Sequence, residues 1–241
     1  MGFMLVKNAR KQGWVAWGLM DFLAQATTAQ FAGKLTYKIV TPNNMLTITY
    51  WQNGTSAKIA ARSVAGSDST HVTNTQDTLL YDIQGLKTTH LVYRTGRAVI
   101  MPNSGELTQQ VIARSRGQQN IAVQTTGAET VNGYVCTHYV ITTGAGNYIT
   151  KRDVWVTKNL GSPGVQVVGE YLYYTPDFPA AVKLLAAGGS GVVVKSVTAT
   201  PWLTTTMNLV AVDTTAPPAS FFAVPGWYTV SDKSQMSLPK Q

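Results

Sequence analysis

Short segments in which apolar and polar residues alternate recur along nearly the whole chain, and a single helix-like stretch interrupts them near the end. At Phe31 to Val40, for example, Leu35, Tyr37 and Ile39 alternate with polar residues. This period of two is typical of strands that bury one face. The helix-like stretch runs from Thr175 to Gly188, with prolines at its start and glycines at its end.

The alternating segments predict a mainly β chain. Gly, Asn and Pro turn signals separate about a dozen strands at intervals of roughly 8–12 residues, which is typical of a sandwich or barrel. The late helix then has two uses, because it can plug an open barrel or line a cavity. The predicted strands span residues 31–40, 45–52, 57–64, 78–83, 87–93, 97–101, 121–125, 134–142, 148–157, 165–174, 192–200, 204–212 and 221–230. Residues 107–115 fit either a strand or a short helix.

The charge pattern argues against a nucleic-acid binder. The chain has a formal net charge of +8, but only 12% of its residues are charged. The basic residues are dispersed, and none of their runs is longer than a pair such as Lys151 and Arg152. Nucleic-acid-binding proteins cluster such residues on one face or along one helix. We therefore expect a scattered basic surface and no nucleic-acid partner.

Residues 1–30 resemble a secretory signal peptide. Lys7, Arg10 and Lys11 precede a mostly apolar stretch, Gly13 to Ala26, which leads into small and polar residues. Asp21 interrupts the apolar stretch, and an amphipathic helix of the mature protein is the alternative interpretation. We predict cleavage near residues 26–30, a single β-rich domain over residues 31–241, and a periplasmic or secreted protein.

The residues that usually carry chemistry are few and scattered. The three histidines, His71, His90 and His138, lack metal-ligand spacing, and no sequence motif of a nucleophile elbow or a phosphate-binding loop occurs. The single cysteine, Cys136, lies on a predicted strand and is expected to be buried and inert. The sequence therefore predicts no catalytic residue, no metal site and no cofactor.

Four segments resemble a known protein family. They are TLLYDIQGLKTTHLVYRTGRAVIMP at 78–102, VNGYVCTHYV at 131–140, the Val-Trp-Val strand at 154–156, and FAVPGWY at 222–228. In this order, with the late helix between them, they resemble a poorly characterised exported bacterial family of the LolA/LolB type, the outer-membrane lipoprotein carrier-like fold. The resemblance extends over about residues 31–230 and implies a strongly curved, open antiparallel sheet, like an unclosed barrel. It also implies that the late helix packs on the concave face, which accepts acyl chains in the carriers.

Alternation within the strands then suggests which side chains line the concave face. We expect a hydrophobic ligand to contact two groups of residues there, although a register error of one position would move every member of a strand to the other face. The strand group is Tyr37, Ile39, Leu46, Ile48, Tyr50, Leu91 and Tyr93, and the helix group is Phe178, Val182 and Leu185.

Three functions fit these patterns. The first is a non-enzymatic exported protein that binds a lipid, a lipoprotein acyl chain or another hydrophobic small molecule, with an envelope protein or a membrane surface as a second partner. The second is a structural or adhesive β domain with a filled core. The third is an enzyme that acts on a small substrate in the cavity. The sequence leaves the ligand and the oligomeric state open.

Overall fold

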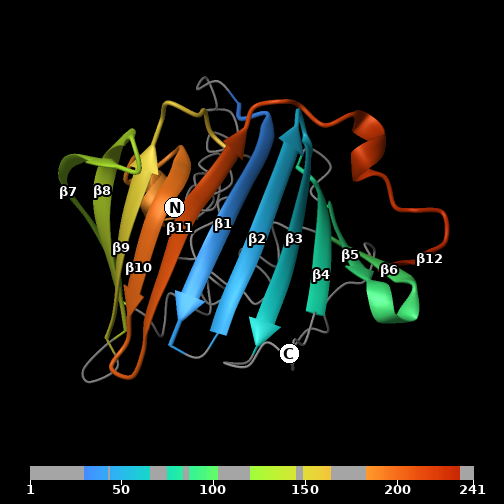
Figure 1. Cartoon of the computed structure of the whole chain (residues 1–241), viewed down its shortest axis with the longest axis horizontal. Helices are drawn as coiled ribbons and strands as arrows, with labels where there is room; N and C mark the ends of the chain where they lie inside the picture. Colours follow the sequence, from blue (N-terminus) through green and yellow to red (C-terminus); the bar gives the residue numbers. More distant parts are fainter. Residues whose placement is uncertain are drawn as a thin grey trace, which may run out of the picture.

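The twelve strands of the protein form one large open sheet. The computed structural model describes residues 30–42, 44–65, 75–83, 87–102, 120–144, 149–163 and 183–233. The strand order in the sheet is β12-β6-β5-β4-β3-β2-β1-β11-β10-β9-β8-β7, so β12 and β7 form its two edges (Figure 1). The expected strongly curved, unclosed antiparallel sheet is confirmed.

The strands follow one another as two antiparallel runs joined in the middle of the sheet. The first run is β1 (Gly33–Thr41), β2 (Asn44–Asn53), β3 (Ser56–Ala65), β4 (Thr75–Asp82), β5 (Lys87–Val92) and β6 (Arg97–Pro102). The second is β7 (Ile121–Val131), β8 (Tyr134–Thr143), β9 (Thr150–Thr157), β10 (Val192–Ala199) and β11 (Thr204–Asp213). Pairing of β11 with β1 joins the runs, and the short β12 (Thr229–Asp232) lies parallel to β6.

Tight turns fix the register of the hairpins. Gly54, with φ 55°, begins the two-residue connection between β2 and β3. Asn132 and Gly133 form the turn between β7 and β8 with φ values of 51° and 81°. Two consecutive positive φ values match a type I′ turn, whose twist suits a hairpin. The β7 strand is accordingly longer than the predicted 121–125, because Gly127 lies at a bulge inside the strand rather than in a turn.

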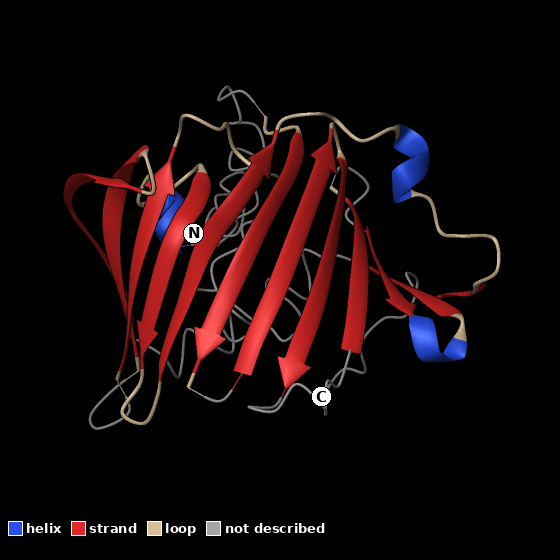
Figure 2. Ribbon diagram, in the orientation of Figure 1, coloured by secondary structure: helices blue, strands red, loops and turns tan. Residues whose placement is uncertain are grey.

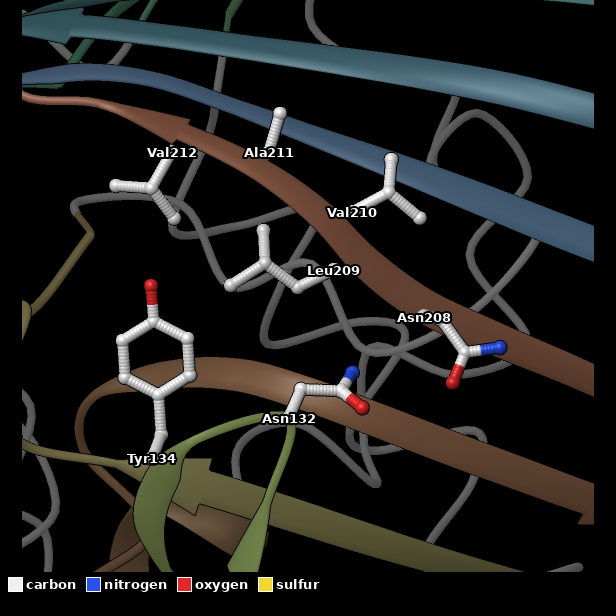
Figure 3. A pocket seen from close by; sticks show the side chains of 7 residues that line it. All are labelled: Asn132, Tyr134, Asn208, Leu209, Val210, Ala211 and Val212. Carbon is white, nitrogen blue, oxygen red and sulfur yellow. The ribbon is translucent and has the colours of Figure 1, made fainter.

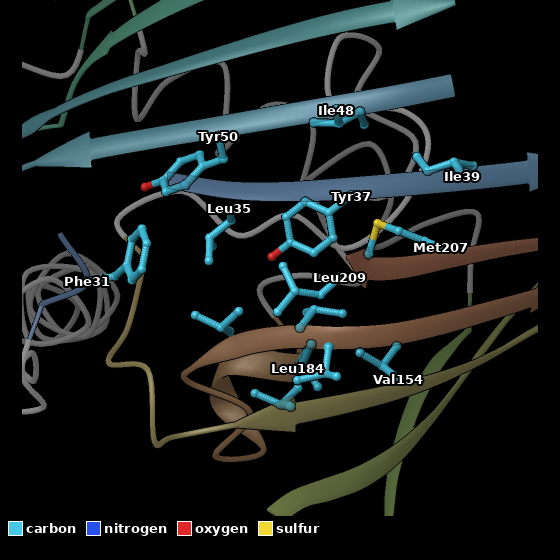
Figure 4. Close-up of a cluster of buried hydrophobic side chains, with 14 of the residues drawn as sticks. Phe31, Leu35, Tyr37, Ile39, Ile48, Tyr50, Val154, Leu184, Met207 and Leu209 are labelled. Carbon is cyan, nitrogen blue, oxygen red and sulfur yellow. The ribbon is translucent and has the colours of Figure 1, made fainter. Parts of the chain in front are cut away.

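The register places the apolar residues on the concave face. Leu35 pairs with Tyr50, Tyr50 with Ile59, and Ile59 with Leu79, so these four side chains form one row across β1 to β4. Each of them is buried. The neighbouring row on the other face begins with Thr36, Thr49 and Ala60, none of which is fully buried. Because apolar and polar residues alternate in this way, the hydrophobic core packs on one face of the sheet (Figure 4).

The late helix packs against the concave face, as expected. Its described part spans residues 183–186, and the chain turns away after it through bonds from the amides of Ala187 and Gly188 (Figure 2). Leu184 has no exposed surface and belongs to the same cluster as Val154 and Leu209. Leu185, predicted to be on the buried side, is only half-buried. Phe178 and Val182 lie outside the described residues.

The predicted closing strand at 221–230 is wrong over most of its length. A 3₁₀ helix, η2 (Ala219–Phe222), occupies its start, and only its last two residues belong to β12. This segment lies on the outer face of the sheet, where Val224 and Tyr228 pack on Leu80, Leu91 and Ala98. Aromatic side chains at the end of the chain therefore cover the sheet instead of extending it. The predicted segments 107–115 and 165–174 lie outside the described residues.

Candidate functional site

The concave face is a continuous apolar surface in the centre of the sheet (Figure 4). Its largest members are side chains with less than 2% of their surface exposed, and they come from β1, β2, β3, β8, β9 and β11 and from the late helix. The apolar members are Tyr37, Tyr50, Leu35, Ile39, Ile48, Ile59, Ile141, Leu184, Met207 and Val154.

Five of the predicted ligand-contacting residues lie together on this face. Tyr37 pairs with Ile48, and Ile39 pairs with Leu46, so the rows run directly across β1 and β2. Tyr37, Ile39, Ile48 and Tyr50 have 0–1% of their surface exposed, and the partly buried Leu46 packs against them. The alternation in β1 and β2 was therefore sufficient to identify their shared face.

Leu91 and Tyr93 do not belong to that face. Leu91 pairs with Thr78, Thr78 with Ala60, and Ala60 with Thr49, which puts the Leu91 side chain on the outer face. There it is buried beneath the C-terminal segment. Tyr93 lies in a 3₁₀ helix, η1 (Tyr93–Thr95), and 69% of its surface is exposed. The strand ends one residue earlier than predicted, so alternation no longer applies to Tyr93.

Buried polar groups at one end of the concave face are hydrogen-bonded. The Tyr50 hydroxyl donates to Gln52 Oε1, and Gln52 Nε2 donates to the Gly54 carbonyl at 3.1 Å. Both Tyr50 and Gln52 have no exposed surface. Burial also raises the pKa of the Tyr37 hydroxyl well above its usual range, with a smaller contribution from Tyr50. Tyr37 therefore acts as a neutral, mostly apolar group at physiological pH.

A pocket of about 610 Å³ lies between the β7–β8 turn and β11. Its size is within the usual range for small-molecule sites. Figure 3 shows the Tyr134 ring pointing toward Leu209 and Val212 from the opposite wall. The lining residues are Asn132, Tyr134, Asn208, Leu209, Val210, Ala211 and Val212. None of them carries a carboxylate, imidazole, thiol or amine, so this pocket offers shape, the hydrogen-bonding amides of two asparagines and the Tyr134 hydroxyl.

Sequence reasoning did not assign the pocket residues to a site. The Asn132–Gly133 pair was a usable signal, because such a pair favours a two-residue hairpin turn and hence places Tyr134 beside it. The bulge between Thr36 and Tyr37 against β11 was not visible in the sequence. It leaves Val210 as an extra residue in β11 and changes which β11 side chains line the pocket.

One polar cluster lies on the face opposite the apolar rows of β9. His138 Nε2 is 2.9 Å from Asp153 Oδ1, and His138 Nδ1 is 3.5 Å from Glu129 Oε1. The imidazole stacks on Trp155 with a centroid distance of 4.5 Å, and Lys195 Nζ lies 4.9 Å from the Trp155 ring centroid. Because both ring nitrogens face carboxylates, neither is directed at a nucleophile. Within the described ranges, no group of three or more potential metal ligands occurs.

One family model matches most of the chain. Residues 31–228 match the model of the family described as a domain of unknown function, DUF4412, and the chain is a member of that family. No protein with a curated description matches it. None of the helices in the described part of the chain is long and apolar enough to span a membrane.

Several solved structures are similar to this chain in fold. MucB in complex with MucA(peri) has 10% identity and a TM-score of 0.42, over 88% of this chain and 60% of that one. LprF from Mycobacterium bovis has 10% identity and a TM-score of 0.33, over 85% and 96% of the two chains. A putative outer membrane lipoprotein-sorting protein domain from Vibrio parahaemolyticus has 11% identity and a TM-score of 0.32, over 85% and 94%. A lipoprotein-sorting domain, the kind of protein that the four sequence segments resemble, is thus among the structures found, and the chain spans only about 60% of the MucB chain.

Proposed function

We propose that the protein is a non-enzymatic binding protein of the cell envelope that holds a lipid or a lipoprotein acyl chain on the concave face of its sheet. The observation that carries this proposal is the extent of the apolar surface. It continues from Ile59 on β3 through Leu35 on β1 and Met207 on β11 to Val154 on β9. An open sheet of this length must shield such a face from water, either with its own side chains or with a ligand.

The polar groups near this face support binding rather than catalysis. Tyr50 and Gln52 bond to each other and to the backbone, and Tyr37 stays neutral. His138, the histidine with two carboxylate neighbours, packs on Trp155 away from the apolar face. An acyl chain needs only apolar contacts and a few fixed polar groups at its end, which is what these residues supply.

We further propose that the protein is exported, with residues 1–30 removed as a signal peptide. The support is the order of a basic segment, an apolar stretch and a small-residue tail in the sequence. N-terminal sequencing of protein from the bacterial envelope fraction tests this proposal. A mature chain that begins near residues 27–31 is the expected result, and retention of Met1 through Gln30 contradicts it.

Lipid extraction and melting experiments test the binding function. Protein purified from native envelopes should carry lipid that native mass spectrometry detects, and delipidated protein should melt at higher temperature as a long-chain fatty acid is added. Ile48→Ala on the concave face should reduce this ligand-dependent shift. Thr49→Ala, at the next residue on the outer face, is the matched control and should leave the shift unchanged.

A structural β domain with a filled core is the second candidate. Leu35, Ile48, Tyr50 and Ile59 each have 0% exposed surface, which a filled core also explains. The same experiments separate the two functions. Protein without co-purifying lipid, together with a melting temperature that does not respond to fatty acid, favours the structural domain.

A further inference from the structure

We propose that one rim of the sheet docks on an anionic lipid bilayer. The rim is formed by the end of the β1–β2 hairpin, the β10–β11 turn and the start of β9. Five of the ten large hydrophobic residues that are exposed in the described part of the chain gather there. These five residues, called the docking rim below, are Val40, Met45, Ile149, Trp202 and Leu203.

The pairing of the strands brings these residues to one end of the sheet. Val40 pairs with Met45 on β2 and with Thr206 on β11. Thr204 lies two residues beyond Thr206, a distance of about 7 Å along the strand. The β10–β11 turn thus extends past the level of Val40, and Figure 1 shows it beside the β1–β2 connection at the same end of the sheet.

The β10–β11 turn holds its apolar residues outward. The Thr200 amide donates to the Leu203 carbonyl at 2.9 Å, and the Leu203 amide donates to Thr200 Oγ1 at 3.0 Å. A turn closed by these bonds has a defined shape. Trp202, at its tip, has 77% of its surface exposed, the largest value among the exposed large hydrophobic residues of the described chain. Ordered exposure of a tryptophan at a protruding tip is the arrangement that membrane–water interfaces favour.

Basic side chains lie directly behind the apolar rim. Lys38 is two residues from Val40 on the same outer face, and its row continues through Thr47 to Arg62. Lys151 pairs with Ala199 next to the β10–β11 turn, and its side chain is 57% exposed. Among the described residues near this rim, Asp153 on β9 is 3.5 Å from Lys151 Nζ and 2.9 Å from His138 Nε2, and Asp77 on β4 pairs with Ala61, the residue before Arg62. The rim is therefore apolar at its edge and positively charged behind it.

This combination favours a lipid surface over a second copy of the chain. Apolar side chains insert into the boundary between headgroups and acyl chains, and each nearby cation gains attraction to anionic headgroups. Two copies that met through their rims would bring Lys38, Arg62 and Lys151 close to the same cations of the partner, which is unfavourable. The inference goes beyond the proposed ligand site, because the docking rim faces outward and can be tested without any ligand on the concave face.

Vesicle flotation tests the docking rim directly. The purified protein should float with vesicles of phosphatidylglycerol and phosphatidylethanolamine, bind weakly to phosphatidylcholine alone, and dissociate as salt increases. Trp202→Ser combined with Leu203→Ser should weaken binding about tenfold, whereas Trp202→Phe should retain most of it. Lys38→Gln combined with Lys151→Gln should weaken binding to the anionic vesicles and flatten its salt dependence.

Matched controls come from the opposite end of the sheet. Val135→Ser removes an apolar side chain that is 60% exposed next to the β7–β8 turn, and Lys158→Gln removes an exposed cation just after β9. Both should bind vesicles as the unaltered protein does, and circular dichroism should show that every variant is folded.

The proposal is overturned if the protein does not float with anionic vesicles, or if it binds phosphatidylcholine equally well at all salt concentrations. Equal losses in the controls also overturn it. A further contrary result is self-association, measured by sedimentation, that Trp202→Ser abolishes while vesicle binding persists. In that case the rim is an interface between copies of the chain.

Discussion

The Phe221 ring packs against the Trp51 ring with a centroid distance of 5.3 Å and an interplanar angle of 59°. Trp51 lies on the outer face of β2, while Phe221 belongs to η2 near the C-terminus. Lys58 Nζ is 4.1 Å from the Phe221 centroid, and Asn53 Nδ2 donates to the Pro217 carbonyl at 2.8 Å. These contacts fasten the C-terminal segment to the outer face of the sheet.

Phe221→Ala should loosen that segment. The side chain is half-buried, so its loss should lower the free energy of unfolding by about 1–2 kcal/mol, less than for a fully buried phenylalanine. Urea denaturation measures the loss, and limited proteolysis should show faster cleavage after residue 213. Val230→Ala, which alters an exposed residue of β12, should change neither quantity measurably. Equal protease resistance in Phe221→Ala and the unaltered protein would show that the packing does not hold the segment.

The sequence predicted most strands and one face of the sheet, because alternation is a local property. Tyr37, Ile39, Ile48 and Tyr50 were placed together correctly for this reason. Leu91 was assigned to the wrong face. Alternation shows which residues of one strand share a face, but it does not show which of the two faces of that strand continues the concave face of a distant strand. Only the hydrogen-bonded register through Thr78 and Ala60 decides it.

The end of the chain shows a second limit of sequence reasoning. Residues 221–230 are aromatic and β-branched enough to resemble a strand. Contacts with Trp51, Leu80 and Ala98, far away in the sequence, instead hold them as a 3₁₀ turn and an extended segment. The pocket between Tyr134 and β11 was unpredictable for the same reason, because it depends on the curvature of the whole sheet.

Leu184, and not Leu185, should be the stabilising residue of the late helix. Leu184 has 0% exposed surface, while Leu185 is half-buried. Leu184→Ala should lower the free energy of unfolding by about 2–5 kcal/mol, because it leaves a cavity among tightly packed neighbours. Leu185→Ala is the matched control and should cost less than half as much. Chemical denaturation of the two variants compares them, and equal losses would contradict the observed placement of the helix.

Gly33 should tolerate no side chain. Its φ is 130°, and a Cβ at this position would collide with the Asp213 carbonyl oxygen of the neighbouring strand. Gly33→Ala should therefore cost about 3 kcal/mol from backbone strain and overpacking together. Gly54 also has a positive φ, of 55°, but a Cβ there meets nothing within 4 Å. Gly54→Ala should cost only about 1 kcal/mol, and thermal unfolding should rank the two variants in this order. The reverse order would contradict the close pairing of β1 with β11.

Alkaline solution should destabilise the protein through its buried tyrosines. Burial raises the pKa of Tyr37 and of Tyr81 above the ordinary value in the folded state. Their contribution to the free energy of unfolding is fully present below the pKa of about 10 that tyrosine has in the unfolded chain. It is lost as the pH rises above that value, because the unfolded chain releases these protons first. The melting temperature should fall steeply above about pH 10, and Tyr37→Phe should make the fall shallower. An unchanged slope in Tyr37→Phe would contradict the role of this hydroxyl.

Cys136 should react slowly while the protein is folded. Its side chain is 1% exposed, its Sγ donates to the Tyr134 carbonyl at 3.4 Å, and burial raises the pKa of the thiol, so little thiolate forms near neutral pH. A maleimide reagent should label it at least about a hundredfold faster in denaturant than in the native state. The Tyr134 carbonyl can also accept a bond from a hydroxyl, so Cys136→Ser should cost near the lower end of about 1–3 kcal/mol. Rapid labelling of the native protein would mean that the β7–β8 hairpin opens readily. The pocket between Tyr134 and β11 would then open with it.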